Sequence, residues 1–307
     1  RCVADPTPAK AQYAARKFGA ESAATDHREL LADPAINTLF ILSGHHVHAH
    51  QVCEGLRAGK HVFVEKPLAM NDAELEGIRE ALGEAPGRLL MVGFNRRFSP
   101  HIEKMRGLLA GRSEPLAMTM TVNAGAIPPD HWTQDPERGG GRIIGEGCHF
   151  IDLLAHLAGA RIVRVAAVRM GEGPAVRDDK MAIVLGFADG SVGTVNYFAN
   201  GSRQYPKETL EVFSEGRVLR MENFRVTRGW GFRGFSKFKT SRQDKGHAAE
   251  VARFLQCVRE GGAPPIAVEE LFDVTRASFR AVESAADDEP PAPRAADSIA
   301  THATSQV

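Results

Sequence analysis

The sequence predicts an α/β protein in which a parallel sheet covered by helices is followed by a domain with an open, mainly antiparallel sheet. In the first hundred residues, short apolar strands such as 39–42 and 61–64 alternate with helical segments and lack the polar alternation of a half-exposed strand. That rhythm is typical of a parallel sheet buried on both faces. Beyond Ser99 the strands are longer and alternate. Turn signals at 188–190 and 214–216 join them as hairpins, which indicates an antiparallel sheet.

The parallel part carries helix signals at both ends of its helical segments. Gly19 and Gly59 follow such segments, as left-handed capping residues do, and Asp26 and Asn71 precede them, as amino-terminal caps do. The expected strands are 2–4, 39–42, 61–64 and 89–94, and the expected helices are 8–18, 26–31, 48–58 and 71–82.

The second part is expected to begin with a helix, to continue with alternating strands that one long helix interrupts, and to end with two late helices. Val251, Phe254, Leu255 and Val258 form an apolar stripe on one of these helices, so we expect it to pack against another element. The expected strands are 116–122, 163–170, 180–187, 191–198, 208–213 and 217–224, and the expected helices are 100–109, 145–157, 247–260 and 268–285.

Composition places the 307-residue chain among ordinary globular proteins long enough for two domains. The formal net charge is zero, so no global field attracts nucleic acid or a membrane surface. No apolar run approaches the roughly 20 residues of a membrane helix. The four cysteines are scattered without metal-type spacing, which favours reduced thiols in a cytoplasmic protein and no metal site.

Two segments fall outside this pattern. Residues 287–307 are rich in Pro, Ala, Asp and Ser without periodicity, and we expect a disordered tail there. Residues 228–239 mix basic and aromatic side chains, which would suit nucleic-acid stacking. One such patch on a neutral chain favours a flexible substrate or subunit loop instead. The G-x-G-x-x-G spacing at 229–234 lacks a strand–helix context and does not indicate a nucleotide site.

The most informative strand is followed by Glu65, Lys66 and Pro67. This buried strand stops at two opposite charges and a proline, which cannot donate to a sheet ladder. Ligands bind at the carboxyl ends of parallel strands, so Lys66 is expected in a ligand crevice. There it can act as an acid–base group or hold a cofactor; the alternative is a surface ion pair with Glu65.

Three segments, in this order and spacing, resemble the Gfo/Idh/MocA oxidoreductases, the glucose–fructose oxidoreductase and inositol dehydrogenase family. They are His48 with the helix that leads to AGK at 58–60, the strand HVFVEKPLA at 61–69, and GGGRIIGEGCHFID at 139–152. The resemblance covers about residues 1–286, and the Gly-rich segment is most similar to the oxidoreductase half of two-domain fusions.

The resemblance implies a fold, a reaction and an assembly. The fold is a Rossmann domain that binds NAD or NADP, joined to a substrate domain with a large open sheet. The reaction is hydride transfer on a sugar, cyclitol or nucleotide sugar. The assembly is a homo-dimer or tetramer formed through the large sheet.

The chain departs from the family pattern at its amino terminus. The Gly-rich phosphate-binding turn of the family lies ahead of the segment that starts at Arg1, so we expect an incomplete Rossmann domain over residues 1–97. We expect the chain to be a piece of a longer polypeptide; the alternative is a protein that has lost the site. The substrate and oligomerisation domain is expected at 98–286.

The resemblance assigns cofactor contacts to the ends of the first strands. Asp5 ends one strand, where a carboxylate accepts hydrogen bonds from the adenosine ribose; the alternative is a strand-ending Asp-Pro turn. No arginine follows Asp5 at once, which favours NAD and leaves NADP possible. The other contacts that the resemblance implies are Ser43, His45, His48, Glu65, Lys66 and Pro67.

The resemblance also assigns the catalytic residues. It places Lys66 between nicotinamide and substrate, and it makes His149 the group that exchanges the hydroxyl proton. Many sugar and inositol dehydrogenases of the family carry an Asp four residues before this His, where this chain has Gly145. Glu146 stands next to that position, about 100° away on a helix, and can replace the Asp only if the backbone shifts. Asp152, one turn from His149, is a candidate to orient it.

Further substrate contacts are expected at the domain junction. Asn95, Arg96 and Arg97 follow a strand end, and an arginine there suits a carboxylate or phosphate of the substrate. Trp132 is a candidate wall of the substrate pocket, and Asp152 is a further candidate contact. These features predict an NAD(P)-dependent sugar or nucleotide-sugar oxidoreductase. The alternative is a non-catalytic nucleotide-sensing or scaffold protein on the same fold.

Overall fold

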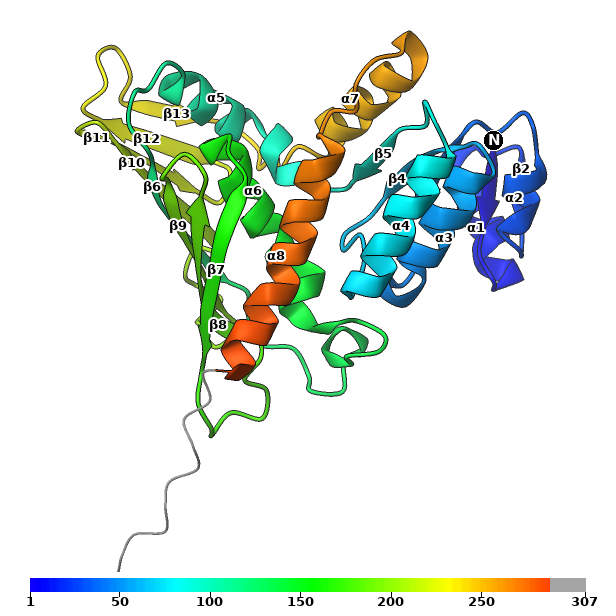
Figure 1. Cartoon of the computed structure of the whole chain (residues 1–307), viewed down its shortest axis with the longest axis horizontal. Helices are drawn as coiled ribbons and strands as arrows, with labels where there is room; N and C mark the ends of the chain where they lie inside the picture. Colours follow the sequence, from blue (N-terminus) through cyan, green and yellow to red (C-terminus); the bar gives the residue numbers. More distant parts are fainter. Residues whose placement is uncertain (288–307) are drawn as a thin grey trace, which may run out of the picture.

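The computed structural model, which describes residues 1–287, begins with short parallel strands that alternate with helices (Figure 1). The first two strands form one parallel pair, and the next three form a second parallel sheet. The strands are β1 (Cys2–Ala4), β2 (Ser22–Ala24), β3 (Thr38–Ile41), β4 (His61–Val64) and β5 (Leu90–Val92). The helices are α1 (Pro8–Phe18), α2 (Arg28–Ala32), α3 (His45–Arg57) and α4 (Asp72–Glu84).

The parallel pairing expected from the unbroken apolar strands is confirmed, and both faces of β4 are covered. β4 lies between β3 and β5. Val62 lies against Gly55 of α3 on one face. On the other face the ring of Phe63 lies 5.8 Å from that of Phe254. Apolar residues therefore occupy every position of the strand from 62 to 64.

Two elements of the parallel part differ from expectation. β2 escapes the sequence pattern because Ser22–Ala24 consists of small residues, of which only the last is buried. α2 begins at Arg28 because the Asp26 carboxylate accepts a hydrogen bond from the Arg28 backbone N–H at 2.9 Å, which forms a turn ahead of the helix. α3 begins at His45, so that His48 lies in its first turn.

An eight-stranded sheet dominates the second part of residues 1–287. Its order is β13-β12-β11-β10-β6-β9-β8-β7, and every neighbouring pair is antiparallel except β6 with β9. The mainly antiparallel sheet predicted from the turn signals is therefore confirmed. The strands are β6 (Ala117–Asn123), β7 (Ile162–Arg169), β8 (Lys180–Phe187), β9 (Val192–Phe198), β10 (Glu208–Ser214), β11 (Arg217–Glu222), β12 (Val226–Trp230) and β13 (Lys237–Lys239).

The prediction of a flexible loop at 228–239 is wrong. β12 and β13 pair as an antiparallel hairpin at the edge of the sheet, with Arg228 opposite Lys237. In the turn, the rings of Phe232 and Phe235 lie edge to face, 6.2 Å apart, and pack on the core. The aromatic residues that suggested an unusual loop are the apolar contacts that hold this hairpin in place.

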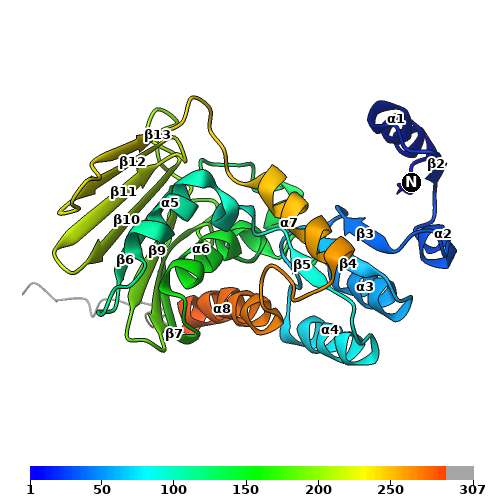
Figure 2. The same cartoon turned by 90° about the horizontal axis from the view of Figure 1, so that it is seen from above.

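Helices cover one face of the large sheet. α5 (Pro100–Leu109), α6 (Cys148–Ala158) and α8 (Val268–Asp287) lie on that face, and α7 (His247–Glu260) reaches the parallel strands (Figure 2). A Cβ at Gly193 of β9 would lie 2.9 Å from Leu154, so this glycine lets α6 approach the sheet closely. The apolar stripe of α7 packs as expected, with Phe254 edge-on to Phe40.

Three short segments complete the described chain: η1 (Asn95–Phe98), η2 (Trp132–Gln134) and η3 (Ile143–Gly147). None of the helices in residues 1–287 is long and apolar enough to cross a lipid bilayer. All four cysteines are free thiols, as expected. The predicted disordered tail lies, apart from Asp287, outside the described residues.

Candidate active site

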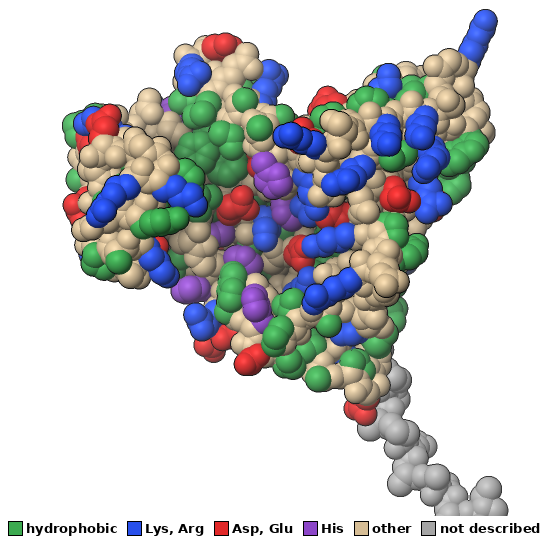
Figure 3. Space-filling model, turned by 180° about the vertical axis from the view of Figure 1, so that it is seen from behind, with side chains coloured by type: hydrophobic (Ala, Val, Ile, Leu, Met, Phe, Trp, Pro, Cys, Tyr) green, Lys and Arg blue, Asp and Glu red, His purple; other side chains and the backbone are tan. Residues whose placement is uncertain are grey.

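A cavity of about 260 Å³ is lined by residues from both parts of the chain. Figure 3 shows histidine and basic side chains gathered in a hollow of the surface. In residues 1–287, no group of three or more His, Cys, Asp or Glu side chains is placed to hold a metal ion. The lining residues of the cavity are His45, Lys66, Arg96, Ile127, His131, Trp132, Thr133, Gly141, Arg142, Gly145, Glu146 and His149.

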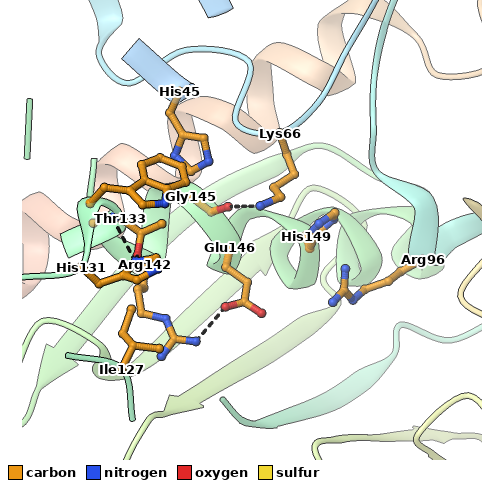
Figure 4. A pocket seen from close by; sticks show the side chains of 12 residues that line it. His45, Lys66, Arg96, Ile127, His131, Thr133, Arg142, Gly145, Glu146 and His149 are labelled. Atoms are coloured by element: carbon orange, nitrogen blue, oxygen red, sulfur yellow. Dashed lines mark hydrogen bonds and ion pairs between the residues drawn. The ribbon is translucent and has the colours of Figure 1, made fainter. Parts of the chain in front are cut away.

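Lys66 reaches the cavity from just beyond the end of β4 (Figure 4). Its ammonium group donates a hydrogen bond to the carbonyl oxygen of Gly145 at 2.9 Å. The alternative ion pair with Glu65 is absent in the described residues, and the Glu65 carboxylate accepts a 3.3 Å hydrogen bond from the Lys66 backbone N–H. An ammonium group has three N–H donors, so Lys66 keeps donors for a ligand.

The π-helix η3 brings Glu146 into the cavity beside His149. A π-helix has more residues per turn than an α-helix, so the side chains that it carries are rotated about the helix axis. The expectation of a regular helix from residue 145 is therefore wrong at its start. The sequence prediction required a backbone shift for Glu146 to reach the site, and the π-helix is an irregularity at this position.

His149 is buried in the cavity wall and is uncharged near neutral pH. The side chain is 5% exposed, and its Nδ1 atom has no hydrogen-bond partner within the described chain. Burial, together with the positive charges of Arg96 and Lys66, holds the pKa of His149 well below its ordinary value. A neutral imidazole can accept a proton, as the sequence prediction for this residue requires.

Asp152 does not orient His149. Both of its carboxylate oxygens accept hydrogen bonds from the buried guanidinium of Arg97, which also donates to Glu270 at 2.9 Å. This network joins η1 to α6 and α8, away from the cavity lining. Asn95 also lies outside the lining, and its amide donates to the Lys245 carbonyl at 2.8 Å. Of the three residues expected at the domain junction, the structure brings only Arg96 to the cavity.

Glu146 is held as a carboxylate by three partners. Its Oε2 atom accepts hydrogen bonds from the Tyr197 hydroxyl at 2.5 Å and from Arg142 at 2.9 Å. The Lys207 ammonium lies 3.6 Å from Oε1. Although burial opposes ionisation, these three partners hold the pKa of Glu146 down at about 2. Glu146 therefore accepts hydrogen bonds at neutral pH and has no proton to donate.

The histidines of α3 lie on the parallel-strand side of the site. His45 Nδ1 lies 2.8 Å from the Gly139 carbonyl oxygen, and its ring packs edge-on against Trp132. Burial lowers the pKa of His45 to about 4, so the neutral ring donates its Nδ1 hydrogen to that carbonyl. Trp132, as expected, forms part of the cavity wall.

His48 is buried between the chain segments that follow β3 and β4. Its Nδ1 lies 2.7 Å from the Pro67 carbonyl oxygen and its Nε2 lies 3.1 Å from that of Ser43. Burial lowers the pKa of His48, so the ring is neutral and donates to one of the two carbonyls. The ring thereby ties the Ser43 loop to the Glu-Lys-Pro segment. The Ser43 hydroxyl donates to Gln51 at 2.7 Å.

Asp5 lies outside the cavity lining, at the end of β1. Its carboxylate accepts a 2.8 Å hydrogen bond from the Thr7 backbone N–H, which is the turn given above as the alternative. The second carboxylate oxygen has no hydrogen bond or ion pair with another described residue, so Asp5 can still accept a bond from a ligand.

The residues that sequence reasoning missed are the partners of Glu146. Arg142 stands four residues before it, a helical pair spacing that could have identified it. Tyr197 and Lys207 come from β9 and the segment before β10, and nothing in the local sequence connects them with Glu146. Ile127, His131 and Thr133 likewise reach the cavity from a segment without a motif.

Two sequence models of one oxidoreductase family match the chain. The model described as "Oxidoreductase family, NAD-binding Rossmann fold" matches residues 1–94. The model described as "GFO/IDH/MocA C-terminal domain" matches residues 111–220. The matches cover the parallel strands and much of the large sheet.

Individual proteins are similar over most of their length. The scyllo-inositol 2-dehydrogenase (NAD(+)) of Bacillus subtilis is 27% identical over 276 residues, which span 86% of this chain and 79% of that protein. The myo-inositol 2-dehydrogenase of Thermotoga maritima is 28% identical over 269 residues, 83% of this chain and 79% of that protein. A structure of levoglucosan dehydrogenase in complex with NADH and L-sorbose has a TM-score of 0.80 and 26% identity, covering 94% of this chain and 87% of the other.

Proposed function

The chain belongs to the Gfo/Idh/MocA oxidoreductase family, and we propose that its active site is the cavity lined by Lys66 and His149. The protein is an NAD-dependent oxidoreductase that acts on a CH–OH group of a sugar or cyclitol. The single observation that carries the site is that Lys66, which follows β4, lines one cavity with Glu146 and His149 of the Gly-rich segment, about 80 positions later in the chain.

The residues that follow β3 and β4 fit the nicotinamide cofactor. Lys66 keeps N–H donors beyond its bond to Gly145, and His149 Nδ1 has no partner, so the site holds unused capacity for polar contacts. We propose that the segments around Ser43 and Glu65, with His45, hold the cofactor, and that Asp5 accepts from its ribose. NAD, when bound, accepts or supplies the hydride.

Lys66 and His149 then have different roles in the reaction. The Lys66 ammonium donates a hydrogen bond to the reacting oxygen and so polarises the C–O bond. In the direction of oxidation, the neutral imidazole of His149 accepts the hydroxyl proton as the hydride leaves the same carbon. In reduction His149 returns it. The lowered pKa of His149 keeps the imidazole in its accepting form near pH 7.

We assign Glu146 a positioning role. It is ionised and already accepts bonds from Tyr197 and Arg142, so it is suited to accept one from a neighbouring substrate hydroxyl. Fixing that hydroxyl holds the reacting carbon in place, which is a large part of catalysis by proximity. Membership of the family, with Lys66 and His149 at one cavity, favours the enzyme over the non-catalytic nucleotide sensor.

We also propose that the enzyme assembles through the uncovered face of the large sheet. The strand register places apolar side chains in one row across that face, from β12 to β9. Exposed apolar rows of this kind mark interaction surfaces, and a second copy of the chain is the occupant that we propose. The residues of the row are Trp230, Val218, Phe213, Ala117 and Val192.

Two further features belong to the proposal. The division into a cofactor domain at 1–97 and a substrate domain at 98–286 agrees with the change from parallel to mainly antiparallel pairing. The four free cysteines and the NAD cofactor support a cytoplasmic location.

Replacement of Lys66 tests the proposed site. Lys66→Ala removes the donor to the reacting oxygen, so we expect turnover of sugar or cyclitol substrates to fall by about two to four orders of magnitude. NADH affinity should stay within about tenfold, because other groups hold most of the cofactor. Turnover is followed by NADH absorbance and affinity by fluorescence titration.

Lys10→Ala serves as the matched control, because Lys10 is exposed on α1 and lies outside the cavity. Its turnover should equal that of the unaltered chain. If Lys66→Ala turned over substrate as fast as Lys10→Ala, the site would have to be placed elsewhere.

A further inference from the structure

A second cavity, of about 340 Å³, adjoins the active site at the end of β6, and Ile127 lines both. We propose that this second cavity is a subsite for an anionic group, a phosphate or a carboxylate, carried by the substrate. The inference rests on the proposed active site, because it extends the same substrate beyond the reacting carbon. Its lining residues are Asn123, Ala124, Gly125, Ala126, Ile127, Arg203, Tyr205 and Lys207.

The charge of this lining carries the inference. It contains two cations, Arg203 and Lys207, and no carboxylate. Arg203 is exposed, and within residues 1–287 its guanidinium has neither a hydrogen bond nor an ion pair. A guanidinium presents a planar fork of donors that matches the oxygens of a carboxylate or phosphate. The hydroxyl of Tyr205, also exposed, adds a further donor.

Lys207 connects the subsite with the active site. Its side chain lines the second cavity, while its ammonium lies 3.6 Å from Oε1 of Glu146 in the first. That separation allows attraction without a hydrogen bond, so the N–H donors of Lys207 stay available to a ligand. A substrate bound across both cavities would meet the carboxylate of Glu146 first and the two cations beyond it.

The loop that carries the cations is fastened to the sheet. The Asn123 amide donates to the carbonyls of Ser202 at 2.7 Å and Tyr205 at 3.3 Å. The Asn123 backbone N–H donates to the Lys207 carbonyl at 2.8 Å. These three bonds hold the backbone from Ser202 to Lys207 at the end of β6, so the loop that carries both cations is in place before a ligand arrives.

Arg142 fixes the spacing between the two cavities. Its Nη1 donates to the Gly125 carbonyl in the wall of the second cavity at 2.7 Å. Its Nη2 donates to the Glu146 carboxylate in the first cavity at 2.9 Å. One buried guanidinium therefore sets the separation of the reacting end of the substrate from the proposed anionic end.

The volumes agree with an extended substrate. Small-molecule sites usually measure about 300–1,000 Å³, and the first cavity, at about 260 Å³, lies just below that range. The second cavity adds about 340 Å³ of space next to it. The site as a whole therefore has room for a sugar ring with a charged substituent.

The test measures binding of three probes by isothermal titration calorimetry: D-glucose, D-glucose 6-phosphate and D-glucuronate. We expect at least one anionic probe to bind about tenfold more tightly than glucose, since hydrogen bonds to charged groups contribute that much. The phosphate and carboxylate probes distinguish the two anions. Arg203→Ala should reduce the preference about tenfold, and added salt should weaken it.

Arg233→Ala is the matched control, because Arg233 is an exposed arginine in the β12–β13 turn, outside both cavities. It should keep the full preference. Equal affinity for all three probes, no measurable binding of either anion, or a preference that survives Arg203→Ala would each overturn the subsite.

The same experiment separates failure of the subsite from failure of the proposed function. Turnover of neutral sugars with NAD tests the proposed function and does not involve Arg203. If turnover is found and no anion preference, the subsite alone fails. If the preference depends on Arg203 and Lys66→Ala leaves turnover unchanged, the subsite stands and the proposed catalytic site fails.

Discussion

Two buried side chains, one in the cavity wall and one on α7, are kept uncharged near neutral pH by their surroundings. His149 Nδ1 and Glu250 Oε2 are both buried without a hydrogen-bond partner in the described residues. Burial lowers the pKa of His149, whereas burial and the nearby Glu65 charge raise the pKa of Glu250 to about 8. Burial thus lowers the pKa of the base and raises the pKa of the acid, and in both cases it favours the uncharged side chain.

The stability of the protein should depend on pH through Glu250. Its pKa is raised from 4.5 to about 8 on folding, so the folded state retains a proton that the unfolded chain has released between those values. The free energy of unfolding therefore falls as pH rises from about 4.5 to about 8. Glu250→Gln removes this loss. We expect its gain in Tm over the unaltered chain to be several degrees larger at pH 9 than at pH 5.

Glu283→Gln is the control for this prediction, because Glu283 lies exposed on α8. Its Tm difference should be the same at both pH values, as measured by thermal unfolding followed by circular dichroism. A Glu250→Gln difference that did not grow with pH would show that Glu250 is ionised in the folded protein.

At the scale of the element, η3 determines which side chains the Gly-rich segment presents. Gly145 carries no side chain, and a Cβ there would lie 2.8 Å from Cε1 of His45. That contact is too close for any other residue unless His45 moves. Two features of this element therefore meet at the cavity, because the π-helix carries Glu146 in the lining and Gly145 leaves room for His45.

Substitution of Gly145 tests this packing. Gly145→Ala should push His45 from its 2.8 Å hydrogen bond to the Gly139 carbonyl. We expect a destabilisation of about 1–3 kcal/mol and a severalfold rise in KM, because His45 lines the cavity. Denaturant unfolding and steady-state kinetics measure the two effects.

Gly147→Ala provides the comparison within the same element. A Cβ at Gly147 would meet Ile143 at 3.4 Å, which is an ordinary van der Waals distance. This variant should be close to the unaltered chain in both measurements. If the two alanine variants behaved alike, the contact with His45 would not be the reason for the glycine.

At the scale of the whole molecule, the two faces of the large sheet differ in what covers them. One face packs on α5, α6 and α8, whereas no helix of the described chain covers the other (Figure 2). Phe213 lies near the middle of the apolar row on the uncovered face and is 46% exposed. A second copy of the chain is the occupant that we propose for this row.

A charge in the apolar row should prevent assembly. Phe213→Lys places an ammonium group in the proposed interface, where burial without a partner is strongly unfavourable. We expect the dimer or tetramer to dissociate to monomers in size-exclusion chromatography with light scattering. Val282→Lys, on the exposed side of α8, should keep the assembly of the unaltered chain. Monomers before any substitution would exclude the interface.

Much of the fold and part of the site could be predicted from local pattern. Unbroken apolar strands indicated parallel pairing, and turn residues indicated the antiparallel sheet, because burial and turn geometry act on neighbouring residues. The end of the strand at Val64 predicted that Lys66 lies at the carboxyl edge of the parallel strands, and Lys66 lines the cavity there. β2 and the β12–β13 hairpin were not predicted, because their small or mixed residues show no clear alternation of apolar and polar side chains.

The partners of the site residues depended on the packed fold. Asp152 accepts hydrogen bonds from Arg97, 55 positions away, and Glu146 accepts one from Tyr197, 51 positions away. Local sequence spacing cannot predict such pairs, because they form where elements far apart in the sequence pack against each other. The backbone shift at η3 and the second cavity beside Arg203 arise in the same way. Sequence pattern therefore proposed the candidate site residues, and tertiary packing decided which of them line one cavity.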